Sequence, residues 1–205
     1  MARKKIAHTR REEIIAGLYD CLAVTGHEQV TLRDIAKRAN VSYGVIHYFF
    51  TCKKDIITAL AKDYVNHRLT LVKSQAAQHD SSPERLHKLV SFLTELIIFE
   101  KKSQRVFLNL YHMALNDRDI WNAYKSSFKR FRGLIQKIVE EGISRGEFDH
   151  AASPASFALM FVSLIEGMAL QTILAPTLFD KQAVKDLLYK YVMIALSPKP
   201  TSPSQ

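Results

Sequence analysis

The stretch from Thr31 to Lys53, TLRDIAKRANVSYGVIHYFFTCK, constrains the fold more than any other part of this chain. It fits two short amphipathic helices joined by a turn of a few residues, which is a helix-turn-helix arrangement. Thr31 and Asp34 have the spacing of a capping box, so the first helix is expected to begin directly after Thr31. Asn40 tolerates a left-handed backbone and is expected to end that helix, while Ser42 is expected to cap the second one.

The second helix of this pair is predicted to have an apolar inner side and a polar, aromatic outer side. Ile46 and Phe49 are expected on the inner side. The outer side carries Tyr43, Gly44, His47 and Tyr48, and it is followed by Lys53 and Lys54. Such a surface suits the major groove of DNA. On spacing alone, an αα-hairpin inside any helical bundle is the alternative, because helix-turn-helix patterns produce false matches.

Positive charge is concentrated near the start of the chain. The 205 residues carry a formal net charge of +9, and residues 1–54 hold ten Lys and Arg against five Asp and Glu. The first eleven residues, MARKKIAHTRR, contain no acid, and Lys5 in this arm is a candidate contact to phosphates or the minor groove. A solvated basic tail is the plainer interpretation of the same run. A helix that supports the other two is expected to begin at Thr9, where T-x-x-E with Glu12 repeats the capping pattern.

The same residues resemble the DNA-binding domain of TetR-type transcriptional regulators. The resemblance rests on Gly26, on Thr31 followed by D-I-A, on N-V-S-Y-G at 40–44, and on an aromatic run closed by Lys53. It covers roughly the first quarter of the chain. His47 stands where that family usually has Tyr, and Cys52 stands where Ser or Thr usually caps the next helix.

The resemblance implies roles for the individual residues of this motif. Phosphate contacts are implied for Thr31, Tyr48 and Lys53. Contacts to base edges are implied for Ser42, Tyr43 and Gly44, with His47 one turn further on. Tyr43 is the expected reader of sequence, although a surface tyrosine without a role is the alternative. Gly44 lacks a side chain, which would let the backbone close on DNA.

The remainder of the chain shows helical periodicity, with no strand pattern and no internal repeat. We therefore predict an all-α protein with a three-helix helix-turn-helix domain over residues 1–53. A larger helical regulatory and dimerisation domain is predicted over 54–197, and a disordered tail rich in Pro and Ser over 198–205.

Residues 154–176 are apolar almost throughout and have about the length of a membrane span. Glu166 in the middle of this segment and a Pro at each end favour burial in protein instead. An amphipathic helix follows over 181–196. The helices near 154–175 and 181–196 are therefore expected to meet their symmetry mates in a four-helix bundle, which the resemblance also implies for a homodimer.

A candidate ligand site is indicated less clearly. The helices between 103 and 166 carry aromatic, Met and ionisable side chains, of which the candidates are Phe107, Tyr111, His112, Met113, Trp121, Tyr124, Phe128, Met160, Phe161 and Glu166. Ordinary core packing is the alternative for the aromatic set. The segment E-G-M-A-L-Q resembles a segment in the betaine-responsive subgroup, in which a carboxylate could hold a cation. Glu166 could equally pair with a basic residue or a cap, and a neutral or anionic lipophile fits the apolar set as well.

These features favour a regulator of transcription over an enzyme. The sequence has no nucleophile elbow, no metal-spaced His or Cys and no Gly-rich phosphate loop, so no catalytic site, metal or cofactor is predicted. We expect a cytoplasmic homodimer that binds a palindromic DNA operator, outside any membrane, and acts as a repressor released by a small-molecule effector. An architectural DNA-binding protein without a ligand is the alternative, with weak sequence preference and steep salt dependence.

Overall fold

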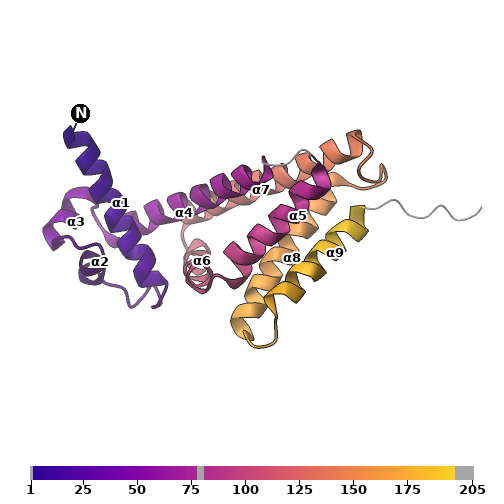
Figure 1. The fold of residues 1–205 in the computed structure, drawn as a ribbon. Coiled ribbons are helices and arrows are strands. Elements are labelled where there is room, and N and C mark those ends of the chain that lie inside the picture. Colours follow the sequence, from indigo (N-terminus) through magenta and orange to yellow (C-terminus); the bar gives the residue numbers. More distant parts are fainter. Residues whose placement is uncertain (1, 78–80, 197–205) are drawn as a thin grey trace, which may run out of the picture. The chain divides into compact units, whose positions relative to one another are not determined.

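The computed structural model describes residues 2–77 and 81–196, and the side chains of residues 2–8 are outside that description. These residues fold into helices, with no strand among them, so the all-α prediction is confirmed (Figure 1). The helices are α1 (Ala2–Leu22), α2 (Leu32–Arg38), α3 (Tyr43–Phe49), α4 (Lys53–Ala76), α5 (Ser82–Leu93), the π-helix η1 (Thr94–Phe99), α6 (Lys101–Ala114), α7 (Arg118–Ser144), α8 (Pro154–Leu174) and α9 (Lys181–Leu196). The predicted tail over 198–205 lies outside the described residues.

The chain forms two compact units. Unit 1 consists of residues 1–67 and 101–127, and unit 2 consists of residues 68–100 and 128–205. The chain therefore passes between the units three times, and two of these crossings lie inside the continuous helices α4 and α7. The boundary placed between residues 53 and 54 stays a prediction, because unit 1 combines the first 67 residues with α6 and the start of α7.

In unit 1, α1 packs across α2 at a very short distance. A Cβ added to Gly17 would lie 2.9 Å from the Ala39 Cβ and 2.9 Å from the Ile35 carbonyl oxygen, so this crossing requires glycine. The start predicted for α1 at Thr9 was wrong, because the helix begins at Ala2. Residues 2–8 include Ala, Arg and Lys and contain neither Gly nor Pro, so the helix continues toward the N-terminus instead of starting at the capping pattern.

Unit 2 is built around a single apolar core shared by its helices. Leu86, Leu89, Ile138, Phe161 and Leu196 are among its fully buried side chains. The helical stretch that begins at Ser82 is divided, with α5 ending at Leu93 and η1 following directly. Pi-helical segments are rare and are often found at functional sites.

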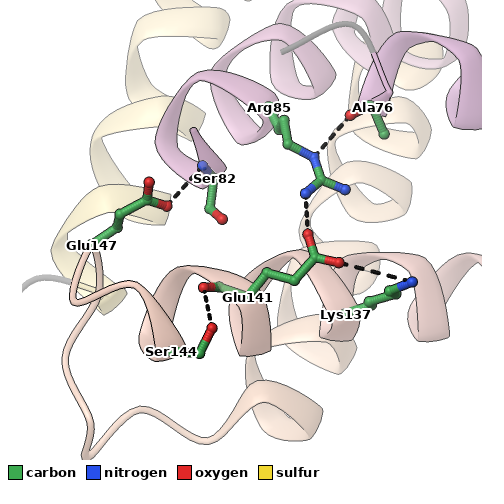
Figure 2. A network of polar contacts seen from close by, with 7 residues as sticks. All are labelled: Ala76, Ser82, Arg85, Lys137, Glu141, Ser144 and Glu147. Atoms are coloured by element: carbon green, nitrogen blue, oxygen red, sulfur yellow. Dashed lines mark hydrogen bonds and ion pairs between the residues drawn. The ribbon is translucent and has the colours of Figure 1, made fainter. Parts of the chain in front are cut away.

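Polar contacts hold the first turn of α5 against the C-terminal part of α7 (Figure 2). The Arg85 Nε donates to the Ala76 carbonyl oxygen at 2.8 Å, and its guanidinium also pairs with the Glu141 carboxylate. The Ser82 backbone N–H donates to the Glu147 carboxylate at 2.9 Å. The hydrogen bond from Arg85 holds the pKa of Glu141 below its usual value. Gly146, two residues after the end of α7, adopts a φ of 72°, in the left-handed region that favours glycine.

Candidate DNA-binding surface and effector site

The helix-turn-helix forms through the local signals read from the sequence. The Thr31 Oγ1 accepts from the Asp34 backbone N–H at 3.2 Å, and an Asp34 carboxylate oxygen accepts from the Thr31 backbone N–H at 2.9 Å, which completes the capping box. These hydrogen bonds to Thr31 lower the pKa of Asp34. Asn40 has a φ of 52°, as predicted for the end of α2. The Ser42 Oγ accepts from the Val45 N–H at 3.4 Å and caps α3.

The outer face of α3 is open to solvent. Tyr43 is 48% exposed and Tyr48 is 81% exposed, and Gly44 and His47 are exposed as well. The Tyr43 and His47 rings lie edge to face with centroids 4.7 Å apart, so the two side chains form one aromatic surface. On the inner side, Ile46 is fully buried and Phe49 is half-buried. The two faces predicted for this helix are therefore present.

Gly44 has no neighbour in the protein that explains the missing side chain. A Cβ added there would meet only the Ser42 Oγ, at 4.0 Å, and the residue has an ordinary helical backbone. Glycine inside a helix costs stability relative to alanine. An external partner that approaches the backbone closely is a physical reason for glycine at this position.

Lys53 holds the loop that precedes α2. Its Nζ donates to the carbonyl oxygens of His27 and Val30, both at 2.7 Å. An ammonium has three N–H donors, so these two hydrogen bonds use two of them. The candidate contact at Lys5 cannot be placed in the same way, because its side chain is outside the described residues.

Asn109 of α6, which the sequence did not single out, connects that helix to the end of α1 and the following loop. Its Oδ1 accepts from the His27 backbone N–H at 2.9 Å, and its Nδ2 donates to the Leu22 carbonyl oxygen at 3.1 Å. The His27 and His112 rings lie 5.3 Å apart in the same place. Burial lowers the pKa of His27, and the charges of His112 and Lys53 act in the same direction. A residue whose contacts lie more than 80 positions away gives no local sequence signal.

A cleft of about 320 Å³ lies beside these contacts in unit 1. Its lining residues are Leu22, Val24, Thr25, Gly26, Arg105, Leu108, Asn109 and His112. Among the predicted ligand residues, His112 is the one that lines this cleft.

The other predicted ligand residues are divided between the two units. Phe107, Tyr111 and Tyr124 form an aromatic cluster in unit 1, with ring centroids 5.8 to 6.5 Å apart, and Trp121 on the same helix as Tyr124 is exposed. In unit 2, Phe128 packs against the apolar core. Met113 and Phe161 are buried, while Met160 is exposed.

Glu166 lies half-buried on α8 in unit 2. Burial raises the pKa of its carboxyl to about 7, although the positive charges of Arg132 and Arg68 act to lower it. Because glutamate is ordinarily ionised well below neutral pH, this carboxyl is unusual in being about half protonated near pH 7.

The helices α8 and α9 leave apolar side chains exposed. On α8 these are Leu159, Met160, Leu170 and Leu174, and on α9 they are Leu187, Tyr191 and Ile194. Within the described part of the chain, α8 is also the one helix whose length and hydropathy would permit a membrane span. That criterion is weak, since core helices of soluble proteins meet it too, and Phe157, Phe161 and Ile165 of α8 lie in the core of unit 2.

The sequence matches two family profiles that together cover most of its length. The profile for bacterial regulatory proteins of the tetR family matches residues 14–60, which include the helix-turn-helix. The profile for the C-terminal region of BetI-type transcriptional repressors matches residues 83–197.

Individual proteins agree with these profiles. The chain is 24% identical over 194 residues to the HTH-type transcriptional regulator PksA of Bacillus subtilis. This alignment covers 92% of the present chain and 91% of PksA. A transcriptional regulator from Saccharomonospora viridis, solved in complex with choline, has the same fold, with a TM-score of 0.81 and 20% sequence identity. The match covers 92% of this chain and 98% of that one. The FadR regulator of Bacillus subtilis in complex with stearoyl-CoA has a TM-score of 0.77 and 19% identity, and the match covers 90% and 98% of the two chains.

These matches account for the helix-turn-helix and for the helical region that follows it, and the family consists of regulators of transcription rather than enzymes. The chain belongs to the TetR family and is a DNA-binding transcriptional regulator whose C-terminal region is of the BetI repressor type.

Proposed function

We propose that this protein is a homodimeric repressor that binds a palindromic operator and is released from it by a small-molecule effector. The observation that carries the proposal is the exposed aromatic face of α3, which includes Tyr43 and surrounds a glycine that the fold itself does not require. A regulator of this kind acts on DNA, and we assign it to the cytoplasm.

The DNA contacts follow from the positions of the side chains around α3. Tyr43 and Gly44, in its first turn, meet base edges in the major groove, with Ser42 and His47 beside them. Tyr48, which is 81% exposed, binds phosphate through its hydroxyl, and Thr31 and Lys53 bind the same backbone. Because Lys53 also holds the 27–30 loop, it keeps α2 and α3 in place while it meets the phosphate.

The dimer forms through the exposed apolar faces of α8 and α9. Leu174 is 76% exposed and Ile194 is 60% exposed, and side chains of this kind are buried at obligate interfaces. Two such helix pairs related by a two-fold axis form a four-helix bundle. The two recognition helices then lie roughly 34 Å apart, which is one turn of DNA.

The effector acts by changing that separation. A ligand that prefers one arrangement of the dimer shifts the population toward it, and a strong shift takes several kcal/mol of differential affinity. The two solved relatives hold very different molecules, one the cation choline and the other stearoyl-CoA. The ligands of these relatives therefore do not define the chemical class of this protein's effector.

The DNA-binding part of the proposal is tested by selecting binding sites from random duplex DNA, without effector. We expect enrichment of a two-fold symmetric site by the native protein and loss of that site in Tyr43→Ala. Tyr111→Ala is the matched control, because Tyr111 is 43% exposed in the same unit but lies on α6. Enrichment of no particular sequence, with binding that weakens steeply in salt, would instead support an architectural DNA-binding protein.

The dimer is tested by sedimentation of Leu187→Glu and Ile194→Glu, each of which places a charge on the exposed face of α9. We expect monomers that retain their helical content and lose affinity for the symmetric site. The matched control is Gln182→Glu, which adds the same charge at an exposed position of α9 that lies on a different side of the helix from Leu187 and Ile194. Dimers of unchanged stability in both test variants would refute this interface.

A further inference from the structure

The cleft in unit 1 has the features of a small ligand site. Its volume is about 320 Å³, and it is bounded by the end of α1, the loop that follows, and α6. On α6 its lining residues are Arg105, Leu108, Asn109 and His112, whose spacing places them on one face of that helix. Ligand pockets begin at about this volume, so the cleft suits a small molecule.

Asn109 holds the two sides of the cleft together. Its Oδ1 accepts from the His27 backbone N–H at 2.9 Å, and its Nδ2 donates to the carbonyl oxygens of Leu22 and Arg105, both at 3.1 Å. Both N–H groups of the Asn109 amide are thus used within the protein. The cleft therefore exists before a ligand binds, and Asn109 itself has no donor left for one.

Other groups that line the cleft keep unused donors. Among the residues whose side chains the structure describes, none forms a hydrogen bond or ion pair with the Arg105 guanidinium or the Thr25 hydroxyl. The backbone N–H of Gly26 likewise donates to no described residue. No aspartate or glutamate is among the described lining residues, so no carboxylate in the cleft competes for these donors. A ligand that binds here must therefore supply hydrogen-bond acceptors.

Gly26 leaves space beside its unused N–H. Its φ lies outside the left-handed region, and a Cβ added there would meet nothing within 4 Å. Neither the backbone conformation nor packing inside the protein therefore requires glycine at this position. An external group that approaches the backbone N–H is a physical reason for the missing side chain, as at Gly44.

The remaining wall of the cleft is apolar and carries one permanent charge. Val24 is 54% exposed and Leu108 is half-buried, so an apolar group that covers them removes their surface from water. Among the described lining residues, Arg105 holds the permanent charge, and a guanidinium binds a carboxylate well. A single negative charge on a short apolar body matches both properties, whereas a cation would be repelled.

We propose that this cleft binds a small amphipathic carboxylate. Its carboxylate oxygens accept from Arg105 and from the loop donors of Thr25 and Gly26, and its apolar body covers Val24 and Leu108. The inference goes beyond the proposed function, because the site lies in unit 1, at the loop that leads into α2.

The test is an NMR titration of the full-length protein with butyrate, hexanoate and octanoate, without DNA. We expect saturable shifts of the Thr25 and Gly26 amide signals and none at Gly133, which lies in unit 2. Affinity should rise by up to about fourfold per added methylene until the cleft is full. Hexanamide and hexylammonium are the matched ligands: the amide should bind at least about threefold more weakly than hexanoate, and the ammonium ion should not bind.

Variants of the lining residues locate the site. Arg105→Gln should weaken hexanoate binding about threefold or more and leave hexanamide binding unchanged, because solvent reduces the attraction at an exposed guanidinium without abolishing it. Gly26→Ala should fold normally, since its Cβ meets nothing, and should also weaken hexanoate binding. Arg118→Gln is the matched control, because Arg118 is exposed in the same unit but does not line the cleft. Thermal denaturation checks that each variant is folded.

The proposal is overturned if hexanoate does not bind, if hexanamide or hexylammonium binds as tightly, if the shifts avoid Thr25 and Gly26, or if Arg105→Gln has no effect. Operator binding is measured separately without ligand. A protein that binds its operator but no carboxylate refutes this inference alone, whereas a protein that binds no operator refutes the proposed function and leaves the titration result standing.

Discussion

Replacing Gly44 with alanine should stabilise the protein and weaken its binding to DNA. A variant that merely folds less well would not show this combination. The added Cβ meets nothing in the protein closer than the Ser42 Oγ at 4.0 Å, so no intramolecular clash opposes it. Alanine gains about 0.5–1 kcal/mol over glycine inside a helix, and the first turn of α3 keeps the gain near the lower value.

The effect on DNA binding comes from the same methyl group. If the backbone at Gly44 lies against the duplex, the methyl group overpacks the interface, and overpacking costs about 1–3 kcal/mol. Each 1.4 kcal/mol is a factor of ten, so operator affinity should fall by about 5- to 150-fold for one half-site. A dimer carries the change twice.

The assay combines thermal denaturation with titration of the selected operator at fixed salt. Gly133→Ala is the matched control: Gly133 is exposed in α7 and a Cβ there also meets nothing within 4 Å. We expect this control to gain stability and keep its operator affinity. If Gly44→Ala bound the operator as tightly as the native protein, the close approach of α3 to DNA would be refuted. A loss of stability would contradict the open space around Gly44.

Three further changes test other parts of the molecule. Gly17→Ala should destabilise unit 1 by about 1–3 kcal/mol in chemical denaturation, because the added Cβ would lie 2.9 Å from the Ala39 Cβ and from backbone atoms of α2. An unchanged free energy of unfolding would contradict the close crossing of α1 and α2. Arg85→Ala should lower the free energy of unfolding by about 1–3 kcal/mol, because it leaves Glu141 without its main partner. Since the pKa of Glu141 is lowered in the folded protein, this loss should be seen at neutral pH and should disappear in acid. The pH dependence from Glu166 has the opposite sign, because burial raises the pKa of this carboxyl from 4.5 to about 7. Its contribution to stability is full below the unfolded pKa and is lost as pH rises through about 7. Glu166→Gln should therefore make the urea midpoint change less with pH between these two values.

The parts of the fold that were predicted correctly from the sequence depend on local interactions. The capping box at Thr31, the left-handed Asn40 and the Ser42 cap each involve residues within four positions of one another, so their spacing is visible in the sequence. The long helices have the same property, because the apolar period recurs every three to four residues.

The features that were missed depend on distant residues. Gly17 is needed only because α2 crosses α1 at that point, and Asn109 binds a loop more than 80 residues away. The π-helix η1 has an ordinary apolar composition, and its Leu96 and Ile98 carbonyl oxygens accept from Arg68 and Thr172. Glu166 was singled out from the sequence, but the two arginines acting on it belong to helices that only the folded chain brings together.

One helix connects the contact between Arg68 and η1 in unit 2 to the DNA-binding motif in unit 1. The helix α4 runs without interruption from Lys53, which holds the loop before α2, to beyond Arg68, which binds η1 and acts on Glu166. A rigid helix that takes part in two sets of contacts transmits a displacement when each set favours a different position of the helix. Loss of the hydrogen bond from Arg68 to the Leu96 carbonyl oxygen would release α4 from η1, and Lys53 on the same helix would respond. The double change Arg68→Gln with Lys53→Met should therefore depart from additivity in operator affinity, whereas independent contacts would give additive effects.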